Sequence, residues 1–383
     1  MHSLSMKNLS IAAPLVMGGL LVVVYVQLYK DLTDYKPIII QKHEKKSVIR
    51  ALPEYRFPAY KYPWPKCRQN ISASGVPGFY SLPHLIQDFL SYRHCRHFPI
   101  ILDIPDKCGG ANGSADIFLL LVIKSSPVNY ARREVLRKTW AKERLQNGVW
   151  IRRIFIAGTT GEGYEKNTLN KLLEIEKLEY NDILQWDFND TFYNLTLKQV
   201  LFLEWMDTNC PNVRFLMNGD DDVLAHTDNM VDYLKNLKDN DGSKHLFTGY
   251  LIENRGPYRY PDLKYYVPVQ VQETDTYPPY LGGGGFLLSG YSAMVMYKMS
   301  HSVMFHPIDD VYIAMCLEKA ELRPTSHIGV KIAGHRSPDN IDPLEPCYFK
   351  EILLVHRFLP AELYVMWNSL HDPNLKCFHK NEQ

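Results

Sequence analysis

The sequence has no excess of charge of one sign, since 43 lysine and arginine residues face 42 aspartate and glutamate residues in a chain of 383. Without a strongly basic surface there is no electrostatic basis for binding nucleic acid, so we expect no nucleic acid partner. Internal repeats and low-complexity tracts are also absent, which excludes solenoid and propeller architectures. The hydrophobic fraction of 46% fits one large or two smaller globular domains.

Several signatures of catalysis and metal binding are missing as well. The patterns GxxxxGK[ST], HExxH and GxSxG do not occur, and the seven cysteines form no CxxC pair. These absences exclude a P-loop, a zinc protease motif, a nucleophile elbow and a thioredoxin-like centre. Scattered cysteines suit disulfides in an oxidising compartment, with one cysteine free or paired between chains; buried thiols in a cytosolic enzyme are the alternative.

One long apolar run stands near the start of the chain. Residues 9–29 contain no charged side chain, which predicts a transmembrane signal anchor after a cytosolic tail at 1–8, rather than a cleaved signal peptide. Lysines after the run favour the opposite orientation by the positive-inside rule. Asn-x-Ser/Thr sequons, which require a lumenal location when glycosylated, nevertheless all follow the run, at Asn70, Asn112, Asn189 and Asn194. Residues 30–66 are rich in Lys, Tyr and Pro and predict a stem, which leaves 67–383 as the lumenal domain.

Strand and helix patterns alternate from Ile117 onward. Continuous apolar runs predict buried strands, and runs with helical periodicity lie between them. This βαβ series indicates an α/β fold with a mostly parallel twisted sheet flanked by helices, in which ligands bind beyond the carboxyl ends of the strands. The expected strands cover 117–125, 150–160, 182–188 and 213–222, and the expected helices cover 129–143, 167–180 and 195–206.

Three consecutive carboxylates, Asp220, Asp221 and Asp222, end the fourth of these strands. Because side chains alternate along an extended chain, we expect Asp220 and Asp222 on one side and Asp221 on the other. Two converging carboxylates suit Mg²⁺ or Mn²⁺ carrying a phosphorylated ligand. A solvated acidic turn before the next helix is the alternative.

A second acidic site places Asp309 and Asp310 at the predicted start of a helix. One carboxylate there caps or stabilises the helix N-terminus, and the other is free to act as a general base. Between the two acidic sites, glycines at 282–285 remove every side chain, which permits a sharp bulge or close approach of a ligand or of backbone.

Six segments, in order, resemble the Golgi β1,3-glycosyltransferases of glycosyltransferase family 31, and most of all its β1,3-N-acetylglucosaminyltransferases. They are SSPVNYARREVLRKTW, NGDDDVLAHTDNM, KYYVP, YPPYLGGGGF, PIDDVY and LLVHRFLP. The resemblance implies a GT-A fold, a single-pass type II Golgi membrane protein with a lumenal catalytic domain, UDP-N-acetylglucosamine as donor, Mn²⁺ or Mg²⁺, and inversion at the anomeric carbon.

The resemblance also assigns roles to individual residues of this sequence. Asp310 corresponds to the catalytic base, with Asp309 as the second choice, and the metal ligands are Asp220, Asp222 and His356. The remaining assignments are Ser125, Arg133, Arg137, Asp220 and Asp221 for the donor nucleotide, and Lys264, Tyr265, Tyr266, Gly283, Gly284 and Gly285 for the substrate. Tyr265 departs from the family, which commonly has Trp there.

The implied reaction transfers N-acetylglucosamine to the 3-hydroxyl of a terminal β-galactose on glycoproteins or glycolipids. A β1,3-galactosyltransferase using UDP-galactose and a non-catalytic lumenal carbohydrate-binding protein are the two alternatives. The sequence leaves open the acceptor, the disulfide pairing, and association with itself or with other Golgi glycosyltransferases.

Overall fold

The computed structural model describes residues 67–332, 341–342 and 344–377. Two sheets form its centre, one of nine strands and one of three. No helix in these ranges is long and apolar enough to cross a membrane, and the span expected at 9–29 lies outside them.

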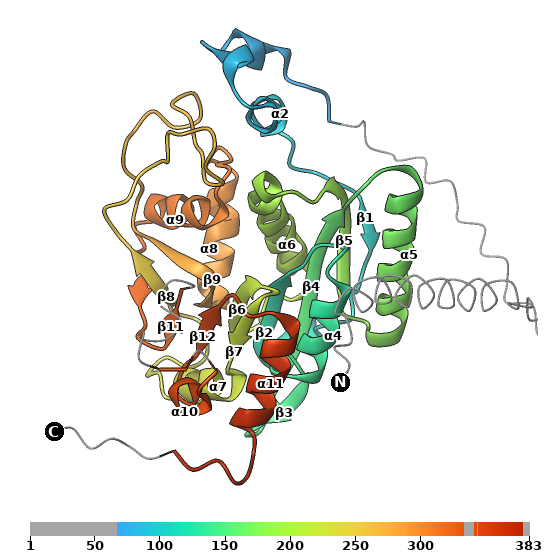
Figure 1. Ribbon diagram of the computed structural model, residues 1–383, viewed down its shortest axis with the longest axis vertical. Helices are drawn as coiled ribbons and strands as arrows, with labels where there is room; N and C mark the ends of the chain where they lie inside the picture. Colours follow the sequence, from blue (N-terminus) through green and yellow to red (C-terminus); the bar gives the residue numbers. More distant parts are fainter. Residues whose placement is uncertain (1–66, 333–340, 343, 378–383) are drawn as a thin grey trace, which may run out of the picture. The chain divides into compact units, whose positions relative to one another are not determined.

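The larger sheet has the order β1-β5-β4-β2-β6-β9-β8-β10, with β3 paired to β4 (Figure 1). Its core of β5, β4, β2 and β6 is parallel, and helical crossovers connect β2 to β4, β4 to β5 and β5 to β6. The strands in chain order are β1 Ile100–Leu102, β2 Ile117–Lys124, β3 Arg144–Gln146, β4 Val149–Thr159, β5 Ile183–Asn189, β6 Phe215–Asp220, β8 Phe247–Ile252, β9 Tyr280–Ser289 and β10 Thr325–Ser326.

The expectation of a mostly parallel sheet is wrong, because the sheet is mixed. Strand β9 runs antiparallel to both β6 and β8, and β1 and β3 are antiparallel to their partners. Beyond residue 222 the sequence pattern predicted individual helices but not the direction in which the strands between them run. One consequence is that β9 begins where β6 ends, with Gly285 opposite Gly219.

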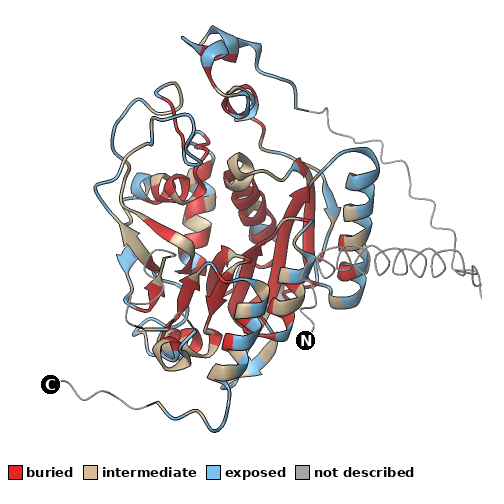
Figure 2. Cartoon of the chain, viewed as in Figure 1, coloured by how far each residue is buried: buried red, intermediate tan, exposed pale blue. Residues whose placement is uncertain are grey.

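Helices cover both faces of the sheet. One face packs against α6 Leu195–Asn209, α8 Gly290–Ser300 and α9 Asp309–Lys319. The other packs against helices α4 Tyr130–Lys138, α5 Gly163–Tyr180, α7 Thr227–Lys235 and α11 Pro360–Leu370. Alternation along β2 sends Leu120 and Val122 to the first face and Leu119 and Leu121 to the second, all fully buried. The central strands are accordingly buried along their length (Figure 2).

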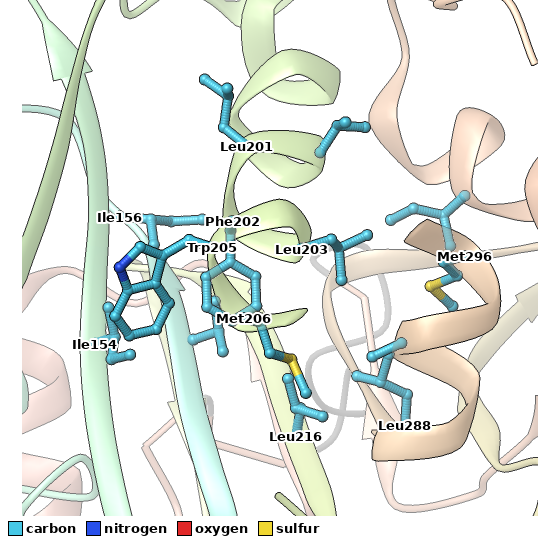
Figure 3. Packing of buried hydrophobic residues seen from close by; sticks show 14 of the residues in the cluster. Ile154, Ile156, Leu201, Phe202, Leu203, Trp205, Met206, Leu216, Leu288 and Met296 are labelled. Carbon is cyan, nitrogen blue, oxygen red and sulfur yellow. The ribbon is translucent and has the colours of Figure 1, made fainter. Parts of the chain in front are cut away.

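Helix α6 is nearly surrounded by protein. Ten of its residues, from Thr196 to Met206, are buried, and its apolar side chains meet the sheet on one side and α8 on the other (Figure 3). Each fully buried Leu, Phe or Met side chain contributes about 1.5–3 kcal/mol relative to exposure. This packing fixes the position of α6 against the ends of β2 and β4.

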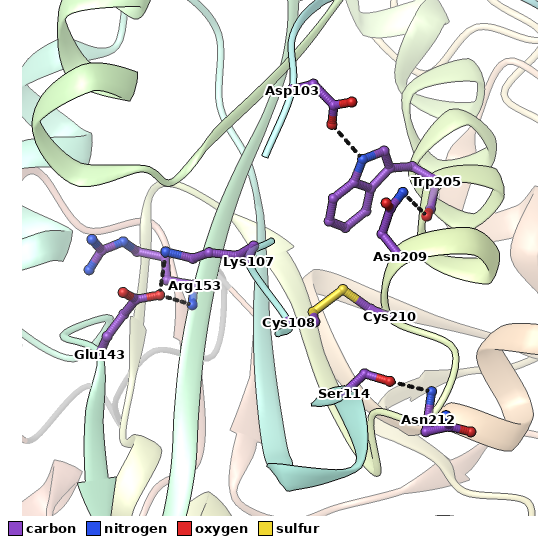
Figure 4. Close-up of a disulfide and its surroundings, with 10 residues drawn as sticks. All are labelled: Asp103, Lys107, Cys108, Ser114, Glu143, Arg153, Trp205, Asn209, Cys210 and Asn212. Carbon is purple, nitrogen blue, oxygen red and sulfur yellow. Dashed lines mark hydrogen bonds and ion pairs between the residues drawn. A yellow bond between two sulfur atoms is a disulfide. The ribbon is translucent and has the colours of Figure 1, made fainter. Parts of the chain in front are cut away.

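Three disulfides join the cysteines, as expected from their scatter: Cys67–Cys95, Cys108–Cys210 and Cys347–Cys377. Cys316 is free and buried. The Cys108–Cys210 bond ties the segment before β2 to the end of α6, next to Trp205, whose indole donates to Asp103 Oδ1 (Figure 4).

The smaller sheet has the order β11-β12-β7. Its strands are β7 Val223–Ala225, β11 Val330–Lys331 and β12 Leu354–His356. Strand β7 follows the carboxylate triplet directly, and its antiparallel pairing with β12 sets His356 opposite Val223. A residue far along the chain is thereby brought beside the acidic turn. The remaining helices are α2 His84–Tyr92, α3 Gly110–Gly113 and α10 Pro346–Phe349, with short 3-10 turns between elements.

Candidate active site

The candidate site lies where β2 and β6 end and where β9 and α9 begin. Lys124 and Asp220 are partners in register at the carboxyl ends of the parallel strands β2 and β6. Lys124 Nζ lies 3.2 Å from Asp220 Oδ1 and 2.7 Å from Asp309 Oδ2 at the start of α9. One buried ammonium group therefore joins the two acidic segments that the sequence separates by almost ninety residues.

The charge state of Lys124 follows from this geometry. Burial alone would lower its pKa, but the negative charges of Asp220, Asp309 and Asp310 outweigh that effect and raise the pKa well above its ordinary value. Lys124 is therefore a fixed cation at every physiological pH.

Three side chains converge as a candidate metal site: Asp220, Asp222 and His356, with one ligand atom of each lying within 4.8 Å of the others. His356 Nε2 is 3.3 Å from Asp222 Oδ1 and 3.9 Å from Asp220 Oδ2. Burial would raise the pKa of Asp222, but the hydrogen bond and charge of His356, together with Arg132, lower it, so this carboxylate is ionised. Its Oδ1 atom is buried without a well-formed hydrogen bond, an arrangement that leaves a lone pair available to a cation.

Asp221 points to the opposite side of the chain and is buried. Its carboxylate accepts hydrogen bonds from Ser125 Oγ at 2.7 Å, Asn129 Nδ2 at 2.8 Å and Arg132 Nη1 at 3.0 Å. These donors come from the loop after β2 and from α4, so they fix the turn that aims Asp220 and Asp222. Asp221 and Ser125, expected at the donor nucleotide, bind each other.

The two carboxylates of α9 have different surroundings. Asp309 is buried and paired with Lys124. Asp310 makes no ion pair within 4 Å among the described side chains, and burial, followed by the charge of Asp309, raises its pKa well above the usual range of an aspartate. A carboxylate that holds a proton more tightly than usual is suited to general base catalysis.

The expected arginine clamp does not form. Arg133 is fully buried and binds Glu176 through Nε and Nη2, at 2.8 Å and 2.7 Å. Arg137 is buried against Asp182, with two hydrogen bonds of 2.9 Å. Both guanidinium groups are bound by protein carboxylates under α4, and Arg133 Nη1 also donates to Ser125 Oγ and to the carbonyl of Ser126. Neither arginine is therefore placed to hold a diphosphate or a uracil.

The side chains of residues 264–266 lie in two different environments. Tyr265 is 41% exposed, and burial followed by the charge of Asp310 raises its pKa, which places the phenol near the acidic centre. Lys264 Nζ lies over the rings of Phe192 and Tyr265, at 4.7 Å and 5.4 Å from their centroids. Tyr266 is buried in a separate apolar cluster with the N-terminal segment, so the substrate role expected for it does not fit its position.

The glycine run of β9 makes room for protein rather than for ligand. A Cβ on Gly284, where φ is +78°, would lie 2.6 Å from His356 Cδ2, and one on Gly285 would lie 2.8 Å from Leu354 Cδ1. Gly283 similarly faces Ile332. The run therefore allows β12 to approach closely enough for His356 to reach the acidic turn.

Two residues of the site were not anticipated from the sequence. Lys124 ends a strand whose other seven residues are all apolar, and a lone charge at that position is the signal that identifies it. Arg132 lies beside the two arginines that were singled out, and it contacts Asp221 and Asp222 at 3.0 Å and 3.4 Å.

Comparison with known proteins identifies relatives of this chain. The chain is 50% identical over 318 residues to human N-acetyllactosaminide β-1,3-N-acetylglucosaminyltransferase 3, covering 82% of this chain and 83% of that protein. It is 47% identical over 320 residues to mouse acetylgalactosaminyl-O-glycosyl-glycoprotein β-1,3-N-acetylglucosaminyltransferase, covering 82% and 80%. A crystal structure of the galactosyltransferase LgtC with donor and acceptor sugar analogs aligns with a TM-score of 0.33 at 15% identity, covering 63% of this chain and 88% of that one.

A family model described as galactosyltransferase matches residues 131–327, which include the acidic turn, the glycine run and the start of α9. Membership of a glycosyltransferase family implies a nucleotide-sugar donor and a glycan acceptor. The chain belongs to the galactosyltransferase family, glycosyltransferase family 31.

Proposed function

We propose that the protein is a GT-A glycosyltransferase that transfers N-acetylglucosamine from UDP-N-acetylglucosamine to the 3-hydroxyl of a terminal β-galactose, with inversion. The contrast between Asp309 and Asp310 carries the proposal. One carboxylate is held by Lys124 at 2.7 Å, and its neighbour is a carboxylate of raised pKa beside the candidate metal ligands. The human and mouse relatives are named β-1,3-N-acetylglucosaminyltransferases, which supports the transferred sugar and the β1,3 linkage.

A divalent cation fits the residues present. Two carboxylate oxygens and an imidazole nitrogen converge, and the buried Asp222 Oδ1 makes no well-formed hydrogen bond. Asp220, Asp222 and His356 would hold the ion, and the imidazole suits Mn²⁺ better than Mg²⁺. When bound, the cation neutralises charge on the diphosphate.

The chain's own residues supply the proton transfer. Asp310 accepts the proton of the galactose 3-hydroxyl while that oxygen bonds to the anomeric carbon and the bond from this carbon to the UDP oxygen breaks. A single displacement inverts the anomeric centre and needs no second carboxylate as nucleophile, by analogy with glycosidases. Asp309 stays bound to Lys124, which holds the first turn of α9 and hence Asp310 in place.

We further propose a Golgi location as a single-pass type II membrane protein, with the described residues in the lumen. Three disulfides are consistent with an oxidising compartment. The sequon residue Asn70 has an exposed side chain, as glycosylation requires. The anchor at 9–29 remains a prediction from the sequence.

A donor and acceptor panel with point variants tests the reaction. We expect transfer from UDP-N-acetylglucosamine to β-galactosides, loss of transfer with EDTA, and no measurable transfer by Asp310→Asn with UDP binding retained. Asp239→Asn, which changes an exposed carboxylate, serves as the matched control. Preference for UDP-galactose would instead establish a β1,3-galactosyltransferase, and metal-independent sugar binding without UDP release would establish a carbohydrate-binding protein.

A further inference from the structure

A large groove lies apart from the residues of the candidate active site. It encloses about 1020 Å³ between the N-terminal segment 67–99 and the ends of β4 and β5, with the start of α6 forming part of its wall. We call it the N-terminal groove; Arg93, Phe98, Thr159, Asn189, Tyr193 and Phe305 are among the residues that line it. None of the candidate metal ligands or α9 carboxylates lines it. Its volume is at the upper end for ligand pockets, which run from about 300 to 1,000 Å³.

Arg93 is the unusual residue of this groove. It follows α2, is half-buried, and its guanidinium has no hydrogen bond or ion pair with any residue in the described part of the chain. The other basic side chains of the groove have carboxylate partners, Lys166 Nζ at 3.1 Å from Asp187 and His97 Nδ1 at 3.5 Å from Glu204. Burial lowers the pKa of Arg93, and no carboxylate compensates for that cost. A partly desolvated cation without a partner favours an anionic ligand.

The rest of the lining is suited to a sugar chain. Aromatic side chains at Tyr92, Phe98 and Tyr193 line the groove together with the amide of Asn189 and the carboxylates of Asp88 and Glu162. Tyr92 is 43% exposed, so its ring is available for contact. Flat apolar rings interleaved with hydrogen-bonding groups match the alternating apolar and hydroxyl surfaces of saccharides.

Contacts connect the groove to the candidate active site. The ring of Tyr193, in the groove, lies 5.5 Å from that of Phe192, which lies 5.4 Å from that of Tyr265 near the acidic centre. Thr196, also in the groove, donates a hydrogen bond of 2.6 Å to the carbonyl of His306, three residues before Asp309. Side-chain contacts through Phe192 and Tyr265 therefore link the groove to the transfer site.

We propose that the N-terminal groove is a subsite for an acidic saccharide, in which Arg93 binds a sulfate or carboxylate carried by an inner sugar of the acceptor. The identity of the ligand as an acceptor rests on the proposed function. The binding of an acidic saccharide does not, and it is measured separately.

The kinetic test compares three acceptors that end in the same β-galactose, using the full-length protein in detergent. One acceptor is neutral, one carries a sulfate on an inner sugar, and one carries a carboxylate-bearing sugar as an inner branch. We expect KM for at least one acidic acceptor to be about tenfold below that of the neutral one, equivalent to about 1.4 kcal/mol, and to rise with salt. Arg93→Ala should remove this preference without changing kcat or KM for the neutral acceptor and the donor.

Two further variants sharpen the test. Arg93→Lys should keep part of the preference, since the charge remains but the planar pair of donors is lost. Arg68→Ala removes an equally charged, exposed side chain that does not line the groove, and it should behave as the unmodified protein.

A binding measurement separates this proposal from the transfer reaction. A sulfated oligosaccharide without terminal galactose, which cannot be an acceptor, should give saturation-transfer NMR signals with the unmodified protein and with Arg68→Ala, and much weaker signals with Arg93→Ala. Equal KM for all three acceptors, a preference that survives Arg93→Ala, or a change in donor KM alone would overturn the proposal. The last outcome would assign the groove to the nucleotide. Binding without any transfer would support the subsite and contradict only the proposed function.

Discussion

Lys124→Met removes the cation that lies between the two acidic segments of the candidate active site. The ammonium group is 7% exposed and lies 2.7 Å from Asp309 and 3.2 Å from Asp220. Methionine keeps the length of the side chain but leaves both carboxylates without this partner. We expect the variant to fold with a lower free energy of unfolding and to have lost most of its transferase activity.

The magnitude follows from burial. Removing one member of a buried ion pair costs about 3–5 kcal/mol, because the remaining charge is desolvated and unpaired. Here two carboxylates lose their partner and a third, Asp310, lies close by, so the upper part of that range is expected. Because the pKa of Lys124 is raised in the folded protein, its contribution to the free energy of unfolding is complete below the unfolded pKa of about 10.4. That contribution is lost only as pH rises through the pKa of Lys124 in the folded protein. The destabilisation should therefore persist across the neutral range.

A double-mutant cycle with Asp309→Asn measures this interaction by urea unfolding followed by tryptophan fluorescence. Asp309→Asn should partly restore the Lys124→Met protein, giving a coupling energy of about 1–3 kcal/mol. Lys171→Met, which removes a 59% exposed partner of Glu174, should cost no more than about 0.5 kcal/mol. Additive effects in the cycle, or a loss below about 1 kcal/mol for Lys124→Met, would refute the assignment of Lys124 as the link between the acidic segments.

Three other predictions concern separate parts of the structure. The pKa of Asp310 is raised in the folded protein, so the stability that the protonated carboxyl group contributes below its unfolded pKa of about 3.9 is lost as pH rises through its folded pKa. Asp310→Asn should therefore raise the melting temperature at pH 7 relative to the unmodified protein. It should not do so near pH 3. Gly284→Ala should displace His356, since the added Cβ would lie 2.6 Å from its ring, and should weaken Mn²⁺ binding at least tenfold by calorimetric titration. Replacing both Cys108 and Cys210 by serine opens a link across 102 residues and should lower the free energy of unfolding by about 2–5 kcal/mol.

A specific experimental result would contradict each of these three predictions. A melting temperature of Asp310→Asn equal to that of the unmodified protein at both pH values would show that burial does not penalise the charged carboxylate. Gly75→Ala, where the added methyl group meets nothing within 4 Å, is the control for the glycine, and equal Mn²⁺ affinity in the two variants would remove His356 from the ligand set. Unchanged urea unfolding of the double serine variant would contradict a stabilising role for the disulfide.

Local patterns in the sequence predicted the parallel half of the sheet well. The apolar run of β2 and the alternation around the carboxylate triplet depend on neighbouring residues only, and the structure has Asp221 facing away from Asp220 and Asp222. The helix expected at 129–143 instead ends at Lys138. Its last turn is lost because Trp140 turns inward and its indole donates a 2.9 Å hydrogen bond to the carbonyl of Val223, a partner that no local pattern contains.

The parts that could not be predicted depend on contacts between distant residues. Arg133 and Arg137 share a helix face, as a phosphate clamp requires, but Glu176 and Asp182 reach that face from α5 and the start of β5. Helical spacing reports which side chains lie together, and it does not report what lies opposite them. For the same reason the sequence suggested that the β9 glycines make room for a ligand, whereas His356 fills the space beside Gly284.

The pairing of β7 with β12 has a consequence for how the protein matures. Val223 and His356 are opposite one another in that pair but 133 positions apart in the chain, so the third candidate ligand arrives only after synthesis has passed residue 356. A ribosome-bound intermediate that has already built the parallel strands still lacks the full coordination set. A cation held by all three candidate ligands would therefore bind late in biogenesis, after β12 has paired with β7.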